Sequence, residues 1–237
     1  MITTDIVTKQ REYFHSGCTR DLKYRLDALR KISTWVKEHE QVILEALKAD
    51  LNKSGTEGYL TEIGVLNEEI RYISKHLKRW TQNRRARTPL MLIPAKSFRV
   101  CDPYGVVLIM SPWNYPFLLS IDPLVGAIAA GNCAVVKPSA YSSHTSSVIA
   151  HMVSECFPPE YITVVEGGRA ENAWLLEQPF DYIFFTGSPS VGKKVMEAAS
   201  ANLTPVSLEL GGKSPVIVEK SADVDLAAKR IVFGKFI

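Results

Sequence analysis

The sequence predicts an α/β fold with a doubly wound, parallel, Rossmann-like sheet that follows an N-terminal helical segment. Apolar runs of strand length recur beyond residue 105, helix-length segments separate them, and glycine, proline or polar residues follow each run. Strands that alternate with helices form βαβ units and a parallel sheet. A strand buried on both faces of such a sheet is continuously apolar, as Val106–Met110 is.

Apolar residues three and four positions apart indicate helices in the first 85 residues. Gly17 is expected to end the helix before the first apolar face. The two faces consist of Leu22, Leu26, Leu29, Ile32 and Val36, and of Ile63, Leu66, Ile70, Ile73, Leu77 and Trp80. The second face leads into a basic cluster of Lys75, Lys78, Arg79, Arg84, Arg85 and Arg87. We interpret the cluster as a solvated helix end, with a patch for a polyanion or a partner as the alternative.

The rest of the chain is expected to form the sheet and its helices. Ala95–Asp102 lies between two prolines and could hold a short strand or hairpin. The expected strands are 106–110, 133–137, 162–165, 182–186 and 206–210, and the expected helices are 118–130, 145–156, 170–178 and 190–201. Gly131 is expected to end the first of these helices, and Pro158 the second.

Composition and charge argue against several classes of protein. Hydrophobic residues make up 46% of the chain and charged residues 22%, which is typical of soluble proteins. A net charge of +3 is too small to indicate a nucleic-acid partner, and no apolar run approaches the roughly 18 residues of a membrane span. The four cysteines contain no CxxC pair, which argues against a disulfide framework or a metal site. We therefore expect a cytoplasmic protein.

A candidate functional segment lies at the end of every expected strand. The segments are, in order, SPWNYP, KPSAYS, EGG, TGSPSVGKK and ELGG. Because parallel sheets bind ligands at the carboxyl ends of their strands, these segments are expected to form one site.

The sharpest pattern is Thr186–Lys194, where a strand enters a glycine turn and a helix leaves it. The helix N-terminus offers free N–H groups and a positive dipole end, which suit a phosphate. Gly187 to Lys193 fits the first part of a P-loop, but Lys194 stands where a P-loop needs Ser or Thr, and the dinucleotide fingerprint GxGxxG is not met. A plain turn is the alternative to a phosphate site.

Three polar side chains complete the candidate site. Lys137 suits the hydroxyl or phosphate groups of a nucleotide, or it is a solvated surface lysine. Asn114 lies in a turn that two prolines restrict, so it can donate to a developing oxyanion; a rigid turn with a packed Trp is the alternative. Glu209 ends an apolar strand, where burial would raise its pKa towards that of a general base, or it is a surface glutamate.

Taken together and in this order, PWNYPF, GNCAVVKPS, FFTGSPSVGKKV and LELGGKSP resemble the aldehyde dehydrogenase superfamily. YITVVEGG followed by FDYIFFTGS is most similar to its class 3 branch, which acts on fatty and aromatic aldehydes. The resemblance covers nearly the whole chain, up to Ile237. It implies oxidation of an aldehyde to a carboxylic acid with NAD or NADP, in a homodimer when the protein is full length. A cysteine forms a thiohemiacetal, hydride passes to the nicotinamide, and a glutamate activates water to hydrolyse the thioester.

The resemblance also implies roles for individual residues. Asn114 matches the oxyanion donor and Glu209 the general base. Lys137 matches the lysine at the adenosine ribose, and Gly187 and Ser188 match the turn that contacts the pyrophosphate. The remaining residues implied to line the cofactor site are Met110, Ser111, Pro112, Trp113, Ser139, Val191, Gly192, Leu210 and Gly211.

Two departures from the family pattern matter. Ala140 stands where NAD-preferring members often have a ribose-binding glutamate, so use of NADP is easier to accommodate. The family's cysteine lies roughly 34 residues beyond the glutamate, at about position 243, in a stretch resembling N-x-G-Q-x-C. None of the four cysteines has that context. The catalytic domain is therefore expected to be truncated, and the polypeptide alone to be inactive and prone to association.

The resulting division of the chain has four parts. Residues 1–88 are the N-terminal helices of the cofactor-binding domain, and residues 89–104 a bridging or oligomerisation segment. Residues 105–210 are the Rossmann-like NAD(P)-binding domain, and residues 211–237 the start of an incomplete catalytic domain. A non-catalytic nucleotide-binding pseudoenzyme and, less favoured, a P-loop-like nucleotide hydrolase remain the alternatives. The sequence does not specify the aldehyde.

Overall fold

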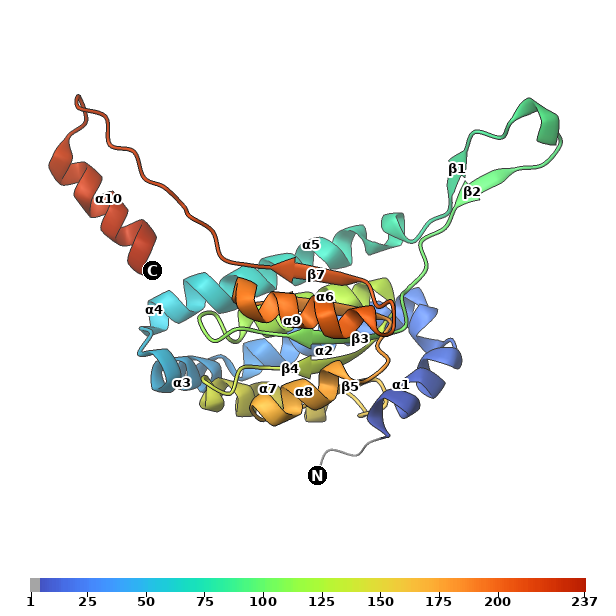
Figure 1. Ribbon diagram of the computed structural model, residues 1–237, viewed down its shortest axis with the longest axis horizontal. Helices are drawn as coiled ribbons and strands as arrows, with labels where there is room; N and C mark the ends of the chain where they lie inside the picture. The colour runs from blue at the N-terminus through green and yellow to red at the C-terminus, as the bar shows by residue number, and fades with distance from the viewer. Residues whose placement is uncertain (1–4) are drawn as a thin grey trace.

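A computed structural model describes residues 5–237, so the first four residues of the predicted helical segment lie outside it. Its centre is a five-stranded parallel sheet in the order β5-β4-β3-β6-β7 (Figure 1). The strands are β3 (Val106–Met110), β4 (Cys133–Lys137), β5 (Ile162–Val164), β6 (Tyr182–Thr186) and β7 (Val206–Glu209). This confirms the predicted α/β class. The strand order reverses between β3 and β6, where ligand crevices form in doubly wound sheets.

The helices between the strands also match the prediction. They are α6 (Leu118–Ala130), α7 (Ser143–Cys156), α8 (Arg169–Leu176) and α9 (Pro189–Ser200). Helix α6 contacts β3 and β4 and α7 contacts β5, whereas α9 contacts β6 and β7. Gly131 ends α6 as predicted, because its φ of 95° is in the left-handed region that glycine adopts readily.

The N-terminal helices are α1 (Ile6–His15), α2 (Leu22–Glu38), α3 (Glu40–Leu51), α4 (Gly55–Gly58) and α5 (Gly64–Trp80), with the 3-10 turn η1 (Cys18–Arg20) and the π-helical turn η2 (Tyr59–Ile63). Of these helices, α2, α3 and α5 form a further layer over α6 and α7, whereas α1 contacts β3 and β4. Helix α2 contacts α5, α6 and α7. Its predicted face is buried at Leu29, Ile32 and Val36 and half-buried at Leu22 and Leu26.

A two-stranded arm extends from the body between α5 and β3 (Figure 1). It consists of β1 (Arg84–Ala86) paired antiparallel with β2 (Ser97–Arg99), with the 3-10 turn η3 (Leu90–Leu92) between them. The strand expected within Ala95–Asp102 is confirmed as β2. The helical reading of the first 85 residues is wrong at its end, because the chain leaves the helix after Trp80. The predicted basic cluster is exposed, and its last three arginines lie in the arm.

After β7 the chain runs away from the body to α10 (Val224–Phe236), which the sequence analysis did not predict (Figure 1). The Asp223 side chain caps this helix by accepting the Leu226 N–H at 3.0 Å. No side chain of α10 is buried. Within residues 5–237, no helix combines the length and the apolar content that crossing a bilayer requires.

Candidate active site

Strand register brings the predicted segments together at the carboxyl edge of the sheet. Met110 is paired with Lys137 on one side and with Phe185 on the other. Thr186 is paired with Glu209 in β7. The residues that follow these strands therefore emerge side by side, as predicted, across the point where the strand order reverses.

The turn between β6 and α9 presents an open helix N-terminus. Ser188 is the N-cap of α9, its hydroxyl accepts the Val191 N–H at 3.4 Å, and Pro189 occupies the first turn. Ser188 and Val191 are exposed. Because the first N–H groups of a helix lack partners within it, this exposed end can receive an anion.

The two glycines of this turn allow close packing within the protein. A Cβ on Gly187 would lie 2.6 Å from Phe185 Cζ, and one on Gly192 would lie 3.0 Å from Leu210 Cδ2. The Gly187 N–H donates to the Glu209 carbonyl at 3.0 Å, which ties the turn to β7. At Gly187 the neighbour that comes close is Phe185 of β6, and at Gly192 it is Leu210, the residue after β7.

Lys137 is buried at the end of β4, with 3% of its surface exposed, so the solvated-lysine alternative is wrong. Its ammonium donates to the carbonyls of Pro138 and Gly167, each at 2.7 Å. Burial lowers the pKa of Lys137, and the carboxylates of Glu171 and Glu166 oppose that shift. An ammonium group has three N–H bonds, so one remains for a ligand. Ser139, two residues further on, is half-buried, and Ala140 is exposed.

The loop that follows β3 carries Asn114. The Ser111 N–H donates to the Lys137 carbonyl at 3.1 Å, which joins this loop to the second strand end. The Ser111 hydroxyl is buried and has no hydrogen-bond partner within residues 5–237. Pro112 is half-buried, whereas Asn114 and Trp113 are exposed, Trp113 by 54%. The alternative of a turn built around a packed Trp is therefore wrong.

Glu209 is exposed, which corrects the expectation that it is buried. Leu210 and Gly211 are exposed too, because the chain leaves the body directly after β7 and does not fold back over the strand end (Figure 1). Within these 237 residues the carboxylate of Glu209 is therefore in contact with solvent.

A buried ion pair behind the Asn114 loop was missed by the sequence analysis. The carboxylate of Glu62 is fully buried, and its Oε1 accepts a hydrogen bond from the Lys53 ammonium at 2.7 Å. Its other oxygen accepts the N–H groups of Phe117 and Leu118, at 2.9 and 3.1 Å. Burial raises the pKa of Glu62, while Lys53 and the two N–H groups oppose the rise. Nothing in the sequence distinguishes Glu62 from neighbouring glutamates such as the half-buried Glu57 or the exposed Glu68.

All four cysteines lie towards the opposite, amino edge of the sheet. Cys133 begins β4 and Cys156 ends α7, and burial raises their thiol pKa values to about 12 and about 11. Cys101 is exposed between the arm and the start of β3. Cys18 precedes Thr19, whose carbonyl lies against Gly131, just before β4. Cys133 is buried in the core, as predicted.

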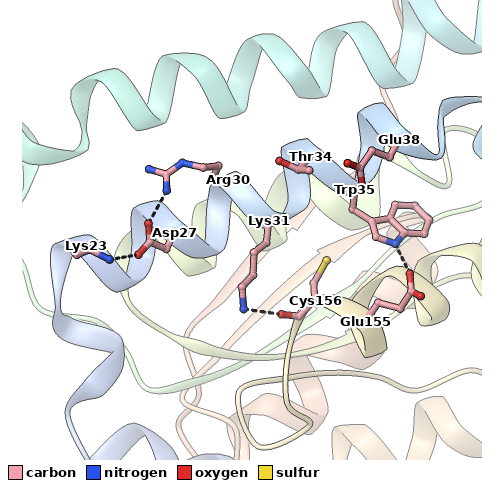
Figure 2. A pocket seen from close by; sticks show the side chains of 9 residues that line it. All are labelled: Lys23, Asp27, Arg30, Lys31, Thr34, Trp35, Glu38, Glu155 and Cys156. Atoms are coloured by element: carbon pink, nitrogen blue, oxygen red, sulfur yellow. Dashed lines mark hydrogen bonds and ion pairs between the residues drawn. The ribbon is translucent and has the colours of Figure 1, made fainter.

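One surface hollow of the body lies between α2 and the end of α7, far from the predicted site residues (Figure 2). There the Trp35 indole donates to Glu155 at 2.6 Å, and the Lys31 ammonium donates to the Cys156 carbonyl at 3.3 Å (Figure 2). Its other polar side chains alternate in charge along α2. The strand ends, rather than this hollow, hold the candidate catalytic groups.

Comparisons with known proteins show which family the chain resembles. The sequence model of the Aldehyde dehydrogenase family matches residues 3–237. The chain is 49% identical over 226 residues to the 4,4'-diaponeurosporen-aldehyde dehydrogenase of Staphylococcus aureus, covering 95% of this chain and 49% of that protein. It is 41% identical to the dimeric NADP-preferring aldehyde dehydrogenase of Canis lupus familiaris, covering 99% and 52%. The chain thus spans about half the length of these relatives.

Two solved structures also superpose on this chain. The substrate-bound state of Staphylococcus aureus AldH superposes with a TM-score of 0.95 at 47% identity, covering 99% of this chain and 51% of that one. The betaine aldehyde dehydrogenase of the same organism, in complex with NAD+, superposes with a TM-score of 0.86 at 28% identity, covering 97% and 46%.

Proposed function

The chain belongs to the aldehyde dehydrogenase family, and from that membership we propose that the complete protein oxidises an aldehyde to a carboxylic acid with NAD or NADP. The observation that carries the proposal is the convergence of Asn114, Lys137, Gly187 and Glu209 on one edge of a parallel sheet, at its topological switch point. A P-loop-like hydrolase is disfavoured because Lys194 replaces the Mg²⁺-binding hydroxyl.

The residues at this edge fit a dinucleotide. The third N–H of Lys137 can reach a ribose hydroxyl, and Ser139 lies beside it. The exposed N-terminus of α9, with Ser188 and Val191, suits the pyrophosphate. The Ser111 hydroxyl, buried and unpartnered within residues 5–237, offers a hydrogen bond to a bound group. The rest of the proposed lining consists of Met110, Pro112, Trp113, Gly187, Gly192, Leu210 and Gly211.

Two side chains are proposed to act on the substrate. When bound, the nicotinamide accepts the hydride of the aldehyde carbon. The Asn114 amide donates to the substrate oxygen as negative charge develops on it. Glu209 takes a proton from the water that releases the acid. Because Glu209 is exposed here, its role depends on a covering surface that these 237 residues do not supply.

The nucleophile is proposed to lie outside these 237 residues. All four cysteines lie towards the amino edge, and the thiols of Cys133 and Cys156 have raised pKa values that disfavour the reactive thiolate. The 237-residue polypeptide alone should therefore show no NAD(P)-dependent aldehyde oxidation. Turnover by the purified, sequence-verified polypeptide would contradict this assignment.

Cofactor preference, substrate and assembly extend the proposal. Ala140 adds no carboxylate beside Lys137, so we propose that the protein uses both NAD and NADP; NADP binding more than about a hundredfold weaker than NAD binding would contradict this. The name of the Staphylococcus aureus relative and the class 3 resemblance favour a long-chain or aromatic aldehyde. We place the protein in the cytoplasm as a homodimer, with the arm as the oligomerisation segment.

The proposal is tested with the complete protein, by titrating NAD, NADP and Mg-ATP and by following reduction of the nicotinamide with apolar aldehydes. Lys137→Met should raise the cofactor KM about tenfold or more, the loss expected for a charged hydrogen bond. The control Lys48→Met removes an exposed lysine of α3 and should leave KM unchanged. Binding of NAD(P) without turnover would favour the pseudoenzyme, and binding of Mg-ATP instead would favour the hydrolase.

A further inference from the structure

The loop that carries Asn114 is fixed by side chains from a distant part of the chain. Glu62 is in the π-helical turn η2, and its carboxylate accepts the N–H groups of Phe117 and Leu118. Phe117 is the N-cap of α6 and supplies no side-chain cap of its own. Glu62 therefore satisfies N–H groups that a helix start leaves without partners, using charge-assisted hydrogen bonds.

Lys53 extends this support to the residue next to Asn114. Its ammonium lies 2.7 Å from the Glu62 carboxylate and 4.0 Å from the centre of the Tyr115 ring. A cation over an aromatic face is attracted to it, most strongly when both are shielded from water. Lys53 has 7% of its side chain exposed and Glu62 none, so the pair is shielded. The chain on the carboxyl side of Asn114 is therefore held at Tyr115, Phe117 and Leu118.

Asn114 has no comparable support of its own. Its side chain is exposed. On its amino side, the Ser111 N–H is bound to the Lys137 carbonyl. Between the backbone contacts at Ser111 and Phe117 only residues 112–116 remain. Pro112 and Pro116 fix φ at both ends of that stretch. The direction of the Asn114 amide thus depends on where these two contacts lie.

The turn η2 explains how Glu62 reaches the loop. Tyr59 and Leu60 are 42% and 59% exposed, whereas Glu62 and Ile63 are fully buried. A π-helical turn shifts the register of a helix locally, so it can direct a polar side chain inward where a regular helix would not. Such turns often occur at functional sites.

We infer that Lys53 and Glu62 form a positioning pair that holds the Asn114 loop in place, so that the Asn114 amide can stabilise the oxyanion of the proposed reaction. The inference rests on the proposed function, because it assigns the pair to catalysis through Asn114. Lys53 and Glu62 are buried and contact the loop at Tyr115, Phe117 and Leu118, so the pair is inferred to act through the loop. Their effect should therefore be on kcat rather than on cofactor binding.

The test is a kinetic double-mutant cycle in the complete protein, with Asn114→Ala, Glu62→Gln and the double variant. Glu62→Gln should lower kcat about 10- to 100-fold and change the cofactor KM less than about threefold. In the Asn114→Ala background the same change should lower kcat less than about threefold, because the residue through which it acts is gone.

A matched control separates positioning from loss of helix stability. Arg25 is buried and donates to the Ala129 carbonyl at 3.1 Å, at the far end of the same helix, α6. Arg25→Met should lower the melting temperature yet leave kcat within about twofold at a temperature where the variant is folded. An equal loss of kcat in Arg25→Met, or full multiplication of the two losses in the double variant, would overturn the inference.

Amide hydrogen exchange gives a second readout that does not depend on activity. Exchange is measured in Lys53→Met/Glu62→Gln, which removes both charges of the buried pair together. Exchange at Phe117 and Leu118 should accelerate about tenfold or more, while Leu124–Ile128 in the middle of α6 stay protected. Unchanged exchange at Phe117 and Leu118 would overturn the inference.

The outcomes distinguish the inference from the proposed function. If Asn114→Ala leaves kcat intact, the role of Asn114 in the proposed function is wrong, and the inference is overturned with it. If Asn114→Ala lowers kcat and Glu62→Gln adds an independent loss, the proposed function survives and only the positioning role is overturned.

Discussion

The charge around Lys137 should determine how strongly the proposed site prefers NAD or NADP. Ala140 is exposed three residues beyond this lysine, and two carboxylates, those of Glu171 and Glu166, already lie close enough to oppose its pKa shift. A 2′-phosphate differs from a ribose hydroxyl chiefly in charge. Each additional carboxylate near Lys137 should therefore weaken NADP more than NAD.

Ala140→Glu should lower kcat/KM for NADP relative to NAD by about tenfold, because an added charge a few ångströms away contributes on the order of 1–2 kcal/mol at a partly solvated site. Steady-state kinetics of the complete protein with both cofactors measures this ratio. Ala140→Gln has nearly the same size without the charge and serves as the control. A shift in Ala140→Gln as large as that in Ala140→Glu would attribute the selectivity to size and contradict the electrostatic account.

The buried thiols should make the fold sensitive to alkaline pH. The pKa values of Cys133 and Cys156 are raised to about 12 and about 11, from the ordinary thiol value of about 8.5. A raised pKa in the folded state contributes stability that is complete below the unfolded value and is lost as pH rises towards the folded value. The free energy of unfolding should thus fall as pH rises from about 8.5 towards about 12.

Denaturant unfolding of the protein across this range checks the prediction. Cys133→Ala/Cys156→Ala should flatten the decline near pH 9.5, below the range in which unfolded tyrosines ionise. Under native conditions the exposed Cys101 should react with a thiol reagent before Cys133 and Cys156 do. Rapid modification of Cys133 in the folded protein, read by mass spectrometry, would show that its burial is not maintained in solution.

At the scale of elements, the turn from β6 into α9 depends on two glycines with different neighbours. A Cβ on Gly187 meets the rigid ring of Phe185 at 2.6 Å. A Cβ on Gly192 comes within 3.0 Å of the end of the Leu210 side chain, which is 42% exposed and can move, and it lies at an ordinary contact distance of 3.6 Å from Leu208. The same added methyl group should therefore have unequal effects.

Gly187→Ala should lower the free energy of unfolding by about 1–3 kcal/mol, since overpacking displaces the ring or the turn. It should also weaken cofactor binding, because the turn leads into the N-terminus of α9. Gly192→Ala serves as the comparison and should stay within about 1 kcal/mol of the parent, as alanine also favours the helix. Denaturant titration measures both values, and equal losses would contradict the account based on Phe185.

How well each element could be predicted depends on whether its side chains face the core. Strands β3, β4 and β6 begin and end at the predicted residues, because each is a short, mostly apolar run. Strands β3 and β4 are buried on both faces, whereas β6 alternates between half-buried and buried residues. Helix α10 was not predicted, since none of its side chains is buried. Of the arm only the strand β2 was expected, since its two strands have three residues each. Elements without a core to face carry little periodic signal.

The candidate site also has parts that could be predicted from the sequence and parts that could not. Its segments could be predicted, because loops at parallel strand ends meet wherever the sheet forms. The burial of Lys137 could not be predicted, because its ammonium donates to the Gly167 carbonyl, 30 residues away. The support that Glu62 gives to Phe117 spans 55 residues and leaves no local pattern. Glu209 is exposed because the chain leaves the body after β7. The sequence of the strand itself does not indicate that path.

At the scale of the whole molecule, two segments leave the body, the arm and the chain after β7 (Figure 1). Exposed apolar side chains gather on both of them. In the arm they are Leu90, Met91, Leu92, Ile93, Phe98 and Val100, and after β7 they are Val216, Ile217, Val218, Val224, Leu226, Val232, Phe233, Phe236 and Ile237. The sheet and its helices form a closed core, so these segments add nothing to it. Contiguous exposed apolar surface of this kind marks sites that bind another protein surface.

The arm allows this to be tested without disturbing the core. Leu90 and Met91 are 84% and 94% exposed, so Leu90→Ser/Met91→Ser should not change the stability of a single chain. If the arm is the oligomerisation segment of the proposed homodimer, the double change should weaken dimerisation of the complete protein at least about tenfold, because apolar anchors carry most of an interface's binding energy. Sedimentation velocity over a dilution series gives the dissociation constant. Leu203→Ser is the control, because Leu203 is 90% exposed but lies just beyond α9, away from the arm. An unchanged dissociation constant in the arm variant, or the same weakening in Leu203→Ser, would exclude the arm as the dimerisation element.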